Sequence, residues 1–438
     1  MNLFPKYVDE INLILTGSSK KNSTLDSIIS GSRSLVESRS SSDNSGVSIY
    51  QLGVEGQTLL SFDRQKMEKL FGKKNSANTK ITIGEHPEFA HLKHNEACHH
   101  YCVSMFVDIE GSTLLATKYP LLDVRRIKDT VLTLCIYVTN FFGGHIHRLQ
   151  GDAIFVQFVG KNLHPNDSII NALNAASVLC QFISVDLSEA FIRNSLDPIK
   201  IRVGIDYGKD EDVLWSNYGI PGCSELTTTS LHTDLAAKLQ AQAAVNEIRI
   251  GKNIKDALDL PDEYWKVVTY KGSNNELIKD EYILNYNDIQ YRKYIFDWRR
   301  YLLSYDFISV SPTSTNLMVD EKKLRIVCKA TTPDGESFIY SQNSSALVKG
   351  TKLEYMLVEN EREYIKKSFE KISWKIENRG KEASDADFLE SEKMSDKSTT
   401  NYAMFESSAA YLGHHFLKCN IEREHTHNDN LKFPIYVR

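Results

Sequence analysis

Two short motifs in the sequence place an aspartate where an apolar run stops. In "SMFVDIEGST" (residues 104–113), Asp108 follows three apolar residues and precedes Gly111. In "GGHIHRLQGDAIFVQF" (residues 143–158), Asp152 follows Gly151 at a tight turn between two strand-like runs. If these runs are neighbouring strands, the two carboxylates converge at one edge of a sheet.

Converging carboxylates predict a particular chemistry. Two of them a few ångströms apart repel, unless one is protonated or a cation neutralises both. Such hard oxygen ligands suit Mg²⁺ or Mn²⁺, which bind a few carboxylates together with substrate phosphates. Gly111, Ser112 and Thr113 follow Asp108, so their backbone N–H groups can approach a polyphosphate at a helix start. The alternative is structural, because Asp or Ser before a helix is a routine N-cap.

A third polar segment, "HLKHNEACHHYC" (residues 91–102), contains the metal-ligand types His and Cys. Its relevant members are His94, Cys98, His99, His100 and Cys102. The segment lacks the paired two-residue Cys spacing that is typical of zinc sites. We therefore expect these side chains to be structural or solvated.

The surrounding sequence indicates which elements must position the two aspartates. Residues 102–286 alternate between short strand-like runs and longer runs with helical spacing, which predicts an α/β domain. Beyond residue 306 short alternating runs are separated by turn formers, which predicts a mainly β domain, a sandwich. Residues 16–48 are rich in Ser and predict a linker. The expected domains are 1–97, 98–290 and 306–438.

Composition restricts the functional classes. The chain has 438 residues, a net charge of -5, and 41% hydrophobic and 25% charged residues, so we expect a soluble protein without a nucleic-acid partner. No apolar run is expected to be long enough to cross a bilayer, and the N-terminus "MNLFPKYVDEINLILTG" carries acids and lacks a signal-peptide pattern. The 7 cysteines are scattered singly. A cytoplasmic protein with no membrane partner is expected.

The motifs taken together resemble the class III nucleotidyl cyclases. The two aspartate motifs are similar to that family's metal motifs, and "IKIRVGIDYGKD" (residues 199–210) to its central strand and glycine turn. "LHTDLAAKLQAQA" (residues 231–243) resembles its dimer-arm helix, and "VVTYKG" (residues 267–272) its late strand. The resemblance covers residues 102–286. It implies an α+β fold with a ferredoxin-like α/β sandwich as the catalytic domain.

The resemblance also implies roles for individual residues. Asp108 and Asp152, helped by the Ile109 carbonyl, would bind two Mn²⁺ or Mg²⁺ ions, and Lys271 would contact the terminal phosphates. The family helix offers Asn and, four residues later, Arg, where this chain has Asp234 and Lys238. Lys238 keeps the positive charge but loses the planar fork of Arg. In the family two catalytic domains pack head to tail and share their sites, so a homodimer is expected.

Two further positions concern the nucleobase. Where adenylate cyclases of the family have Lys and Asp or Thr, this chain has Arg148 and Thr227. Arg148 has only donors, which suit O2 and N3 of cytosine or O4 of uracil. Alternatively Arg148 pairs with a surface acid. The pocket is not expected to suit adenine, and it lacks the Glu by which guanylate cyclases accept from guanine.

A second resemblance concerns the flanking regions. "IGEHPEFAHL" (residues 83–92) is similar to the segment before the core in pyrimidine cyclases of bacterial Pycsar antiphage systems. "KISWKIENRGKEA" (residues 371–383) and "AAYLGHHFLKCNIE" (residues 409–422) resemble the AGS-C sensor domain. The matching positions are Trp374, Asn378, Gly380, Glu382, Ala383, Gly413 and His414. This resemblance implies a CTP or UTP cyclase of antiviral defence whose product, cyclic CMP or cyclic UMP, activates a separate effector.

Three alternatives stay open at this point. In the first, the chain is an adenylate cyclase with an unusual base pocket. In the second, it is a degenerate nucleotide-binding module that has lost catalysis, as the replacements at Asp234 and Lys238 would indicate. A palm-type polymerase or dinucleotide cyclase also fits the two-aspartate logic, but not the "TDLAAKLQ" helix followed by "YKG".

Overall fold

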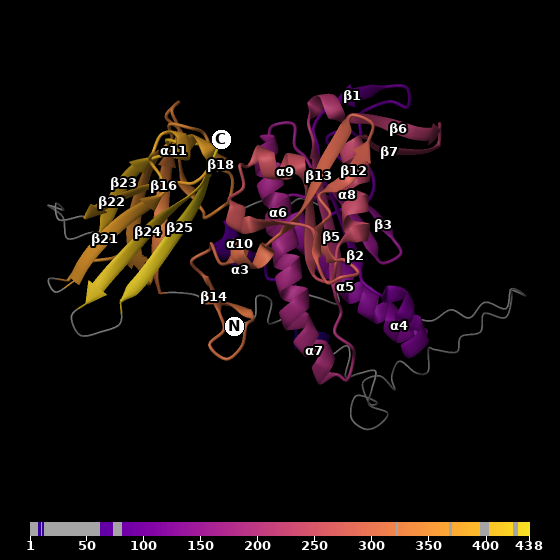
Figure 1. Cartoon of the computed structure of the whole chain (residues 1–438), viewed down its shortest axis with the longest axis horizontal. Helices are drawn as coiled ribbons and strands as arrows, with labels where there is room; N and C mark the ends of the chain where they lie inside the picture. The colour runs from indigo at the N-terminus through magenta and orange to yellow at the C-terminus, as the bar shows by residue number, and fades with distance from the viewer. Residues whose placement is uncertain are drawn as a thin grey trace, which may run out of the picture.

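The computed structural model describes residues 8–9, 11–12, 62–72, 81–320, 323–367, 370–394, 403–423 and 428–438. The predicted Ser-rich linker at residues 16–48 lies outside the described residues. Figure 1 shows two bodies side by side, an α/β body that contains the early elements and a β-rich body that contains the late ones.

One large sheet forms the centre of the α/β body, in the order β12-β13-β8-β5-β2-β4-β3, with β9 paired to β13. Its strands are β2 (Cys102–Ile109), β3 (His145–Gln150), β4 (Ala153–Phe158), β5 (Ile201–Gly208), β8 (Glu247–Gly251), β9 (Trp265–Val267), β12 (Tyr282–Tyr286) and β13 (Ile289–Phe296). β4 lies antiparallel between β2 and β3, and β5 pairs antiparallel with β2. This is the split βαβ arrangement of a ferredoxin-like sheet, so the predicted fold class is confirmed.

Helices cover both faces of this sheet. They are α4 (Ser112–Lys118), α5 (Leu121–Phe141), α6 (Pro165–Gln181), its continuation through the π-helical turn Phe182–Leu187 into α7 (Ser188–Arg193), α8 (Leu231–Gln242) and α9 (Lys252–Ala257). In Figure 1, α6 and α8 lie on opposite sides of the central strands. Even-numbered residues of β2 face α8, as the 3.0 Å contact between the hydroxyls of Ser104 and Thr233 shows.

The expectation that no apolar run is long enough to cross a bilayer was wrong. The helix Pro165–Arg193 has the length and composition of a membrane span, although 89% of its most apolar window is buried inside the protein. α6 is apolar around most of its circumference because it packs between the sheet and the C-terminal body (Figure 1). It is the core helix of the molecule.

A three-stranded sheet and a two-stranded sheet lie outside the main sheet. β1 (Ala97–His99), β6 (Leu214–Ile220) and β7 (Cys223–Thr229) form a separate three-stranded sheet, and β10 (Thr269–Lys271) pairs with β11 (Leu277–Lys279). α10 (Trp298–Leu302) then leads through β14 (Ile308–Val310) and β15 (Leu317–Val319) toward the C-terminal body.

The C-terminal body consists of two five-stranded sheets around one apolar core. The first contains β16 (Leu324–Thr331), β17 (Ser337–Tyr340), β19 (Lys352–Glu359), β20 (Arg362–Glu363) and β23 (Met404–Ser408). The second contains β18 (Ala346–Leu347), β21 (Glu370–Glu377), β22 (Glu390–Met394), β24 (Gly413–Arg423) and β25 (Asp429–Val437). Trp374 is fully buried and stacks on Phe405 with ring centroids 5.6 Å apart, so the two sheets share a core and form the predicted sandwich.

The two bodies meet at buried polar groups. The Asn174 amide oxygen on α6 accepts from the hydroxyls of Tyr301 (2.7 Å) and Tyr305 (2.6 Å). Its amide nitrogen donates to the Asn343 carbonyl (3.1 Å), and the Asn343 side chain contacts His414 at 2.9 Å. Burial lowers the pKa of His414 well below its ordinary value, so its ring is neutral in this contact.

Candidate active site

The register of the central strands places the two motif aspartates at the same end of β2 and β4. β2 and β4 pair from Val103–Phe158 to Val107–Ile154. Asp108 is therefore one residue beyond the last pair, and Asp152 is two residues before Ile154 on the other strand. Both side chains are largely but not fully buried, with exposed fractions of 18% and 17%.

Asp108 has two partners that the sequence did not predict, one charged and one neutral. Its Oδ2 pairs with the guanidinium of Arg202, which lies directly opposite on β5, and accepts from the Gln240 amide at 3.2 Å. These partners are 94 and 132 residues away along the chain, so no local pattern pairs them. The only signal was a basic residue on the strand of "IKIRVGID". The Arg202 guanidinium neutralises the Asp108 carboxylate without a bound cation.

Asp152 retains an unused ligand atom. It follows Gly151, whose φ of 67° is in the left-handed region that the tight β3–β4 turn requires. Its Oδ1 lies 3.4 Å from the Lys128 ammonium on α5, whereas its Oδ2 is buried and has no hydrogen-bond partner in the described part of the chain. A carboxylate oxygen that binds a metal ion is expected to be buried and to have no hydrogen-bond donor when the ion is removed.

The donor set therefore fits a divalent cation, with one restriction. Among the described residues no group of three or more His, Cys, Asp or Glu side chains surrounds a common point. The predicted ligands are two carboxylates and the backbone carbonyl of Ile109, which is the last residue of β2 and is buried. Mg²⁺ and Mn²⁺ are commonly held by one or two carboxylates plus substrate phosphates and waters, so this set is sufficient.

The helix after Asp108 does not use the aspartate as its cap. Gly111 is the N-cap of α4, with φ 68° and no side-chain cap, and Ser112 is the first helical residue. The N-cap interpretation of Asp108 is therefore wrong. A Cβ added to Gly111 would meet nothing within 4 Å, so there is open space beside the turn. Ser112 is buried and Thr113 is exposed, and both follow this turn.

The predicted substrate residues of α8 point away from the aspartates of the same chain. Asp234 and Lys238 are exposed and lie on one helix face, because they are four residues apart. Gln240, which reaches Asp108, lies on nearly the opposite face. One chain therefore does not bring Asp234 and Lys238 together with Asp108 and Asp152.

Lys271 is also separate from the aspartates in the described chain. It ends β10, opposite Leu277 of β11, and its side chain is exposed. No ion pair of Lys271 is present among the described residues, so its ammonium group can meet a phosphate.

Arg148 and Thr227 lie on neighbouring elements. Arg148 of β3 binds Glu225 of β7 through two bonds, Nε to Oε1 at 2.9 Å and Nη2 to Oε2. Thr227 is two residues further along β7 and half-buried. Arg148 therefore pairs with a surface acid, as the alternative interpretation predicted. Glu225 is a neighbour of Arg148 that the sequence analysis did not single out, because the two residues are 77 positions apart.

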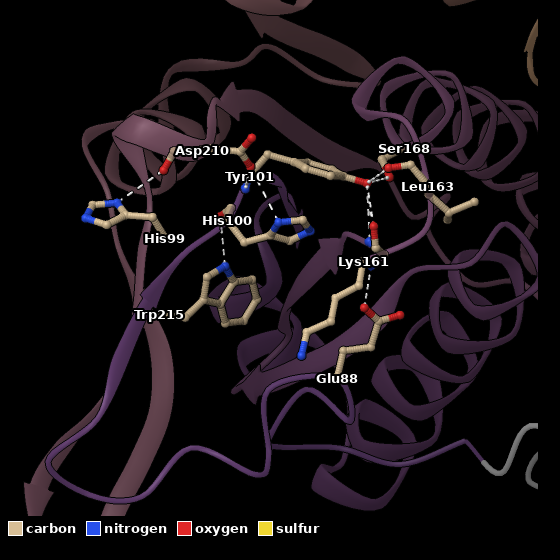
Figure 2. Close-up of polar contacts among 10 residues, drawn as sticks. Glu88, His99, His100, Tyr101, Lys161, Leu163, Ser168, Asp210 and Trp215 are labelled. Carbon is tan, nitrogen blue, oxygen red and sulfur yellow. Dashed lines mark hydrogen bonds and ion pairs between the residues drawn. The ribbon is translucent and has the colours of Figure 1, made fainter.

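The histidine-rich segment makes structural contacts. Figure 2 shows Asp210 between His99 and Tyr101, with Tyr101 N–H donating to its Oδ1 (2.7 Å) and His99 Nδ1 3.2 Å from its carbonyl. The Trp215 indole donates to the His100 carbonyl at 3.0 Å (Figure 2). Burial raises the pKa of Cys102 to about 12, so this thiol stays protonated and is a poor metal ligand. His94 is exposed, and Cys98 is half-buried.

Curated relatives decide the family. The chain is 38% identical over 357 residues to a cytidylate cyclase of Staphylococcus aureus, which covers 81% of this chain and 82% of the relative. Two cytidylate cyclases of Escherichia coli are 35% and 34% identical over 54% and 50% of this chain, and over 52% and 49% of their own length. The chain belongs to the cytidylate cyclase family.

Further comparisons concern separate parts of this cyclase. Residues 305–435 match the family described as the adenylyl/guanylyl and SMODS C-terminal sensor domain. Among solved structures, the adenylyl cyclase CyaB from P. aeruginosa aligns with 46% of this chain and 95% of its own, at 16% identity and a TM-score of 0.38. The guanylyl cyclase Cya2 aligns with 46% of this chain and 91% of its own, at 16% identity and a TM-score of 0.35.

Family membership makes this chain a nucleotidyl cyclase enzyme of the pyrimidine cyclase group, with a nucleoside triphosphate as substrate. Class III cyclases generally depend on divalent metal ions, and the orphaned Asp152 oxygen is consistent with that dependence.

Proposed function

We propose that the chain converts CTP, ahead of UTP, to the 3′,5′-cyclic nucleotide and pyrophosphate. The observation that carries this proposal is the position of Asp108 and Asp152 at the same end of the paired strands β2 and β4, in a chain whose curated relatives are named cytidylate cyclase. The resemblance of residues 83–92 to Pycsar cyclases supports the same substrate class.

The metal ligands in this proposal are the two aspartates and the Ile109 carbonyl. Mn²⁺ or Mg²⁺, two ions per site, would replace Arg202 and Lys128 as the neutralising charges of Asp108 and Asp152. When bound, such ions lower the pKa of the ribose 3′-hydroxyl and neutralise phosphate charge.

The chain's own residues then hold and orient the nucleotide. Lys271 pairs with the terminal phosphates, and the N–H groups after Gly111 contact the polyphosphate. The 3′-hydroxyl gives up its proton to solvent, its oxygen attacks the α-phosphorus in line, and the bond from this phosphorus to pyrophosphate breaks. Lys238 stabilises the charge on the equatorial oxygens, a contribution of about 3–4 kcal/mol for a well-placed donor. Asp234 accepts from a ribose hydroxyl.

A homodimer completes the site in this proposal. Because Asp234 and Lys238 face away from the aspartates of their own chain, they suit the aspartates of a second copy. A head-to-tail pair related by twofold symmetry has two equivalent sites.

The wider role follows the predicted organisation of the chain. The catalytic domain comprises residues 98–290, and the domain that senses an infection signal comprises residues 306–438. An N-terminal extension comprises residues 1–97. The cyclase acts in the cytoplasm as part of an antiviral system, and its cyclic nucleotide activates a separate effector that harms the infected cell.

The test is turnover of the four nucleoside triphosphates by the purified full chain with Mn²⁺, followed by chromatography of the products. We expect cyclic CMP, with less cyclic UMP. Conversion of ATP alone would indicate the adenylate cyclase alternative. If the chain binds CTP without turning it over, it is a degenerate module. In that case Asp108→Ala should not change the amount of any product.

A further inference from the structure

The contact between Arg148 and Glu225 joins two different sheets. Arg148 belongs to β3 of the large sheet, whereas Glu225 belongs to the β6–β7 hairpin, which projects beside β3 in Figure 1. Both side chains are accessible, with exposed fractions of 49% and 38%. An accessible pair of this kind contributes little to stability, about 0–1 kcal/mol, so stability alone gives little reason for its two-bond geometry.

The neighbours of the pair form a small polar surface. Thr227 lies on the same face of β7 as Glu225, because the two are separated by one residue. The ring Nε2 of His147 lies 3.1 Å from Glu225 Oε1 on the inner side of the pair. This surface presents a group with only donors, a group with only acceptors and a hydroxyl that can do either.

This set matches one pyrimidine better than the other. Cytosine has an N4 amino donor beside the N3 and O2 acceptors, and a carboxylate is a standard acceptor for N4. Arg148 can donate to N3 and O2 while Glu225 accepts from N4. Uracil has an O4 acceptor in place of the amino group, and its lone pairs would face the Glu225 carboxylate without a proton between them.

We infer that Glu225 is a specificity-determining residue, which accepts from the exocyclic amino group of the base and disfavours UTP. This inference rests on the proposed function, because it assumes that Arg148 and Thr227 face the nucleobase. In the free enzyme Glu225 holds the Arg148 guanidinium by two bonds, so the donor is already oriented when the nucleotide arrives.

The test compares kcat/KM for CTP and UTP in the full-length enzyme and in Glu225→Gln. The amide can donate to O4 as well as accept from N4, so we expect the CTP-to-UTP ratio to fall by about 10- to 100-fold. Glu225→Ala removes both the acceptor for N4 and the repulsion of O4, so CTP turnover should fall while UTP turnover should rise. Ser224→Ala, at the adjacent exposed position of the same strand, is the matched control and should keep the wild-type ratio.

The outcomes separate the two proposals. If Glu225→Gln lowers CTP and UTP turnover equally, Glu225 only positions Arg148 and the inference is overturned, while the pyrimidine cyclase proposal stands. If the wild-type chain neither converts nor binds a pyrimidine triphosphate, the proposed function itself fails. If turnover is too slow to measure, calorimetric Kd values for CTP and UTP in Ca²⁺ replace it, and the preference for binding CTP should be smaller in Glu225→Gln than in the wild type.

Discussion

At the scale of single residues, Asp152 carries a structural penalty that its proposed role as a metal ligand would explain. Its Oδ2 is buried without a donor in the described chain, and a buried unsatisfied acceptor costs about 1–3 kcal/mol. Asp108, in contrast, is paired with Arg202 and Gln240. The unpaired oxygen is therefore the best indication of where the proposed cation would bind.

Asp152→Asn should lower CTP turnover at least about 100-fold, because the amide loses the charge that a cation requires. The same change should leave the melting temperature unchanged or slightly raised, since it removes a poorly satisfied buried charge. Turnover assays and thermal melts measure the two effects. Asp197→Asn, at an exposed residue paired with Lys118, is the control. Full activity of Asp152→Asn would exclude it as a metal ligand.

The buried ring of His86 predicts that the folded chain loses stability in acid. Its ring is buried beside His145 and Trp215, and its Nδ1 accepts from the Glu88 N–H at 3.3 Å, which requires the neutral form. Burial, with smaller contributions from neighbouring histidines, lowers the pKa of His86 from 6.5 to about 3. The unfolded chain therefore binds a proton that the folded chain does not, and stability falls as pH drops below 6.5 toward 3.

Between pH 7 and pH 5, His86 alone should lower the free energy of unfolding by about 2 kcal/mol. His86→Asn keeps an acceptor near Nδ1 and does not titrate, so denaturant unfolding of this variant should lose that part of the pH dependence. An unchanged pH dependence would show that His86 is not the titrating group.

At the scale of elements, the contact of α8 with β5 determines where the proposed substrate residues lie. Gly204 of β5 lies under α8, and a Cβ added there would collide with the backbone of Ala236 and Gln240. This close approach lets Gln240 reach Asp108 while Asp234 and Lys238 stay on the exposed side. The glycine in "IRVGID" is thus required by packing between elements rather than by a turn.

Gly204→Ala should destabilise the chain by about 3 kcal/mol, because the helix backbone must move away from the strand. Ala241→Leu adds more atoms on the exposed side of α8 and should leave the melting temperature unchanged. Thermal melts of the two variants test this expectation. Equal melting temperatures would mean that α8 does not pack on β5 this closely.

At the scale of the whole molecule, the proposed dimer makes a strict prediction. Asp152→Ala and Lys238→Ala remove residues that, in a head-to-tail pair, belong to the same site from different chains. Each variant alone should be inactive. A mixture that exchanges subunits should regain one working site in each mixed dimer. Absence of recovery, with mixed dimers demonstrated by differently tagged chains, would place all site residues in one chain.

The two bodies of the chain should unfold together because they share buried groups. Asn174→Ala removes the bond to the Asn343 carbonyl of the C-terminal body and the acceptor for the hydroxyls of Tyr301 and Tyr305, and should cost about 3 kcal/mol. Asn166→Ala, in the first turn of the same helix, is the control. Calorimetry should give one transition for the wild type. A separate, unshifted transition of the β sandwich in Asn174→Ala would show that the junction does not couple the two bodies.

Sequence by itself determined the alternating strands and helices, the turn at Gly151, the β character of the C-terminal part and the cyclase family, because each depends on local pattern or on ordered motifs. Tertiary structure decided which charges meet. Arg202 with Asp108, Lys128 with Asp152 and Glu225 with Arg148 are far apart in sequence, and only strand register and helix packing bring them together. The local pattern also could not distinguish a buried core helix from a membrane span, because both are apolar around most of their circumference.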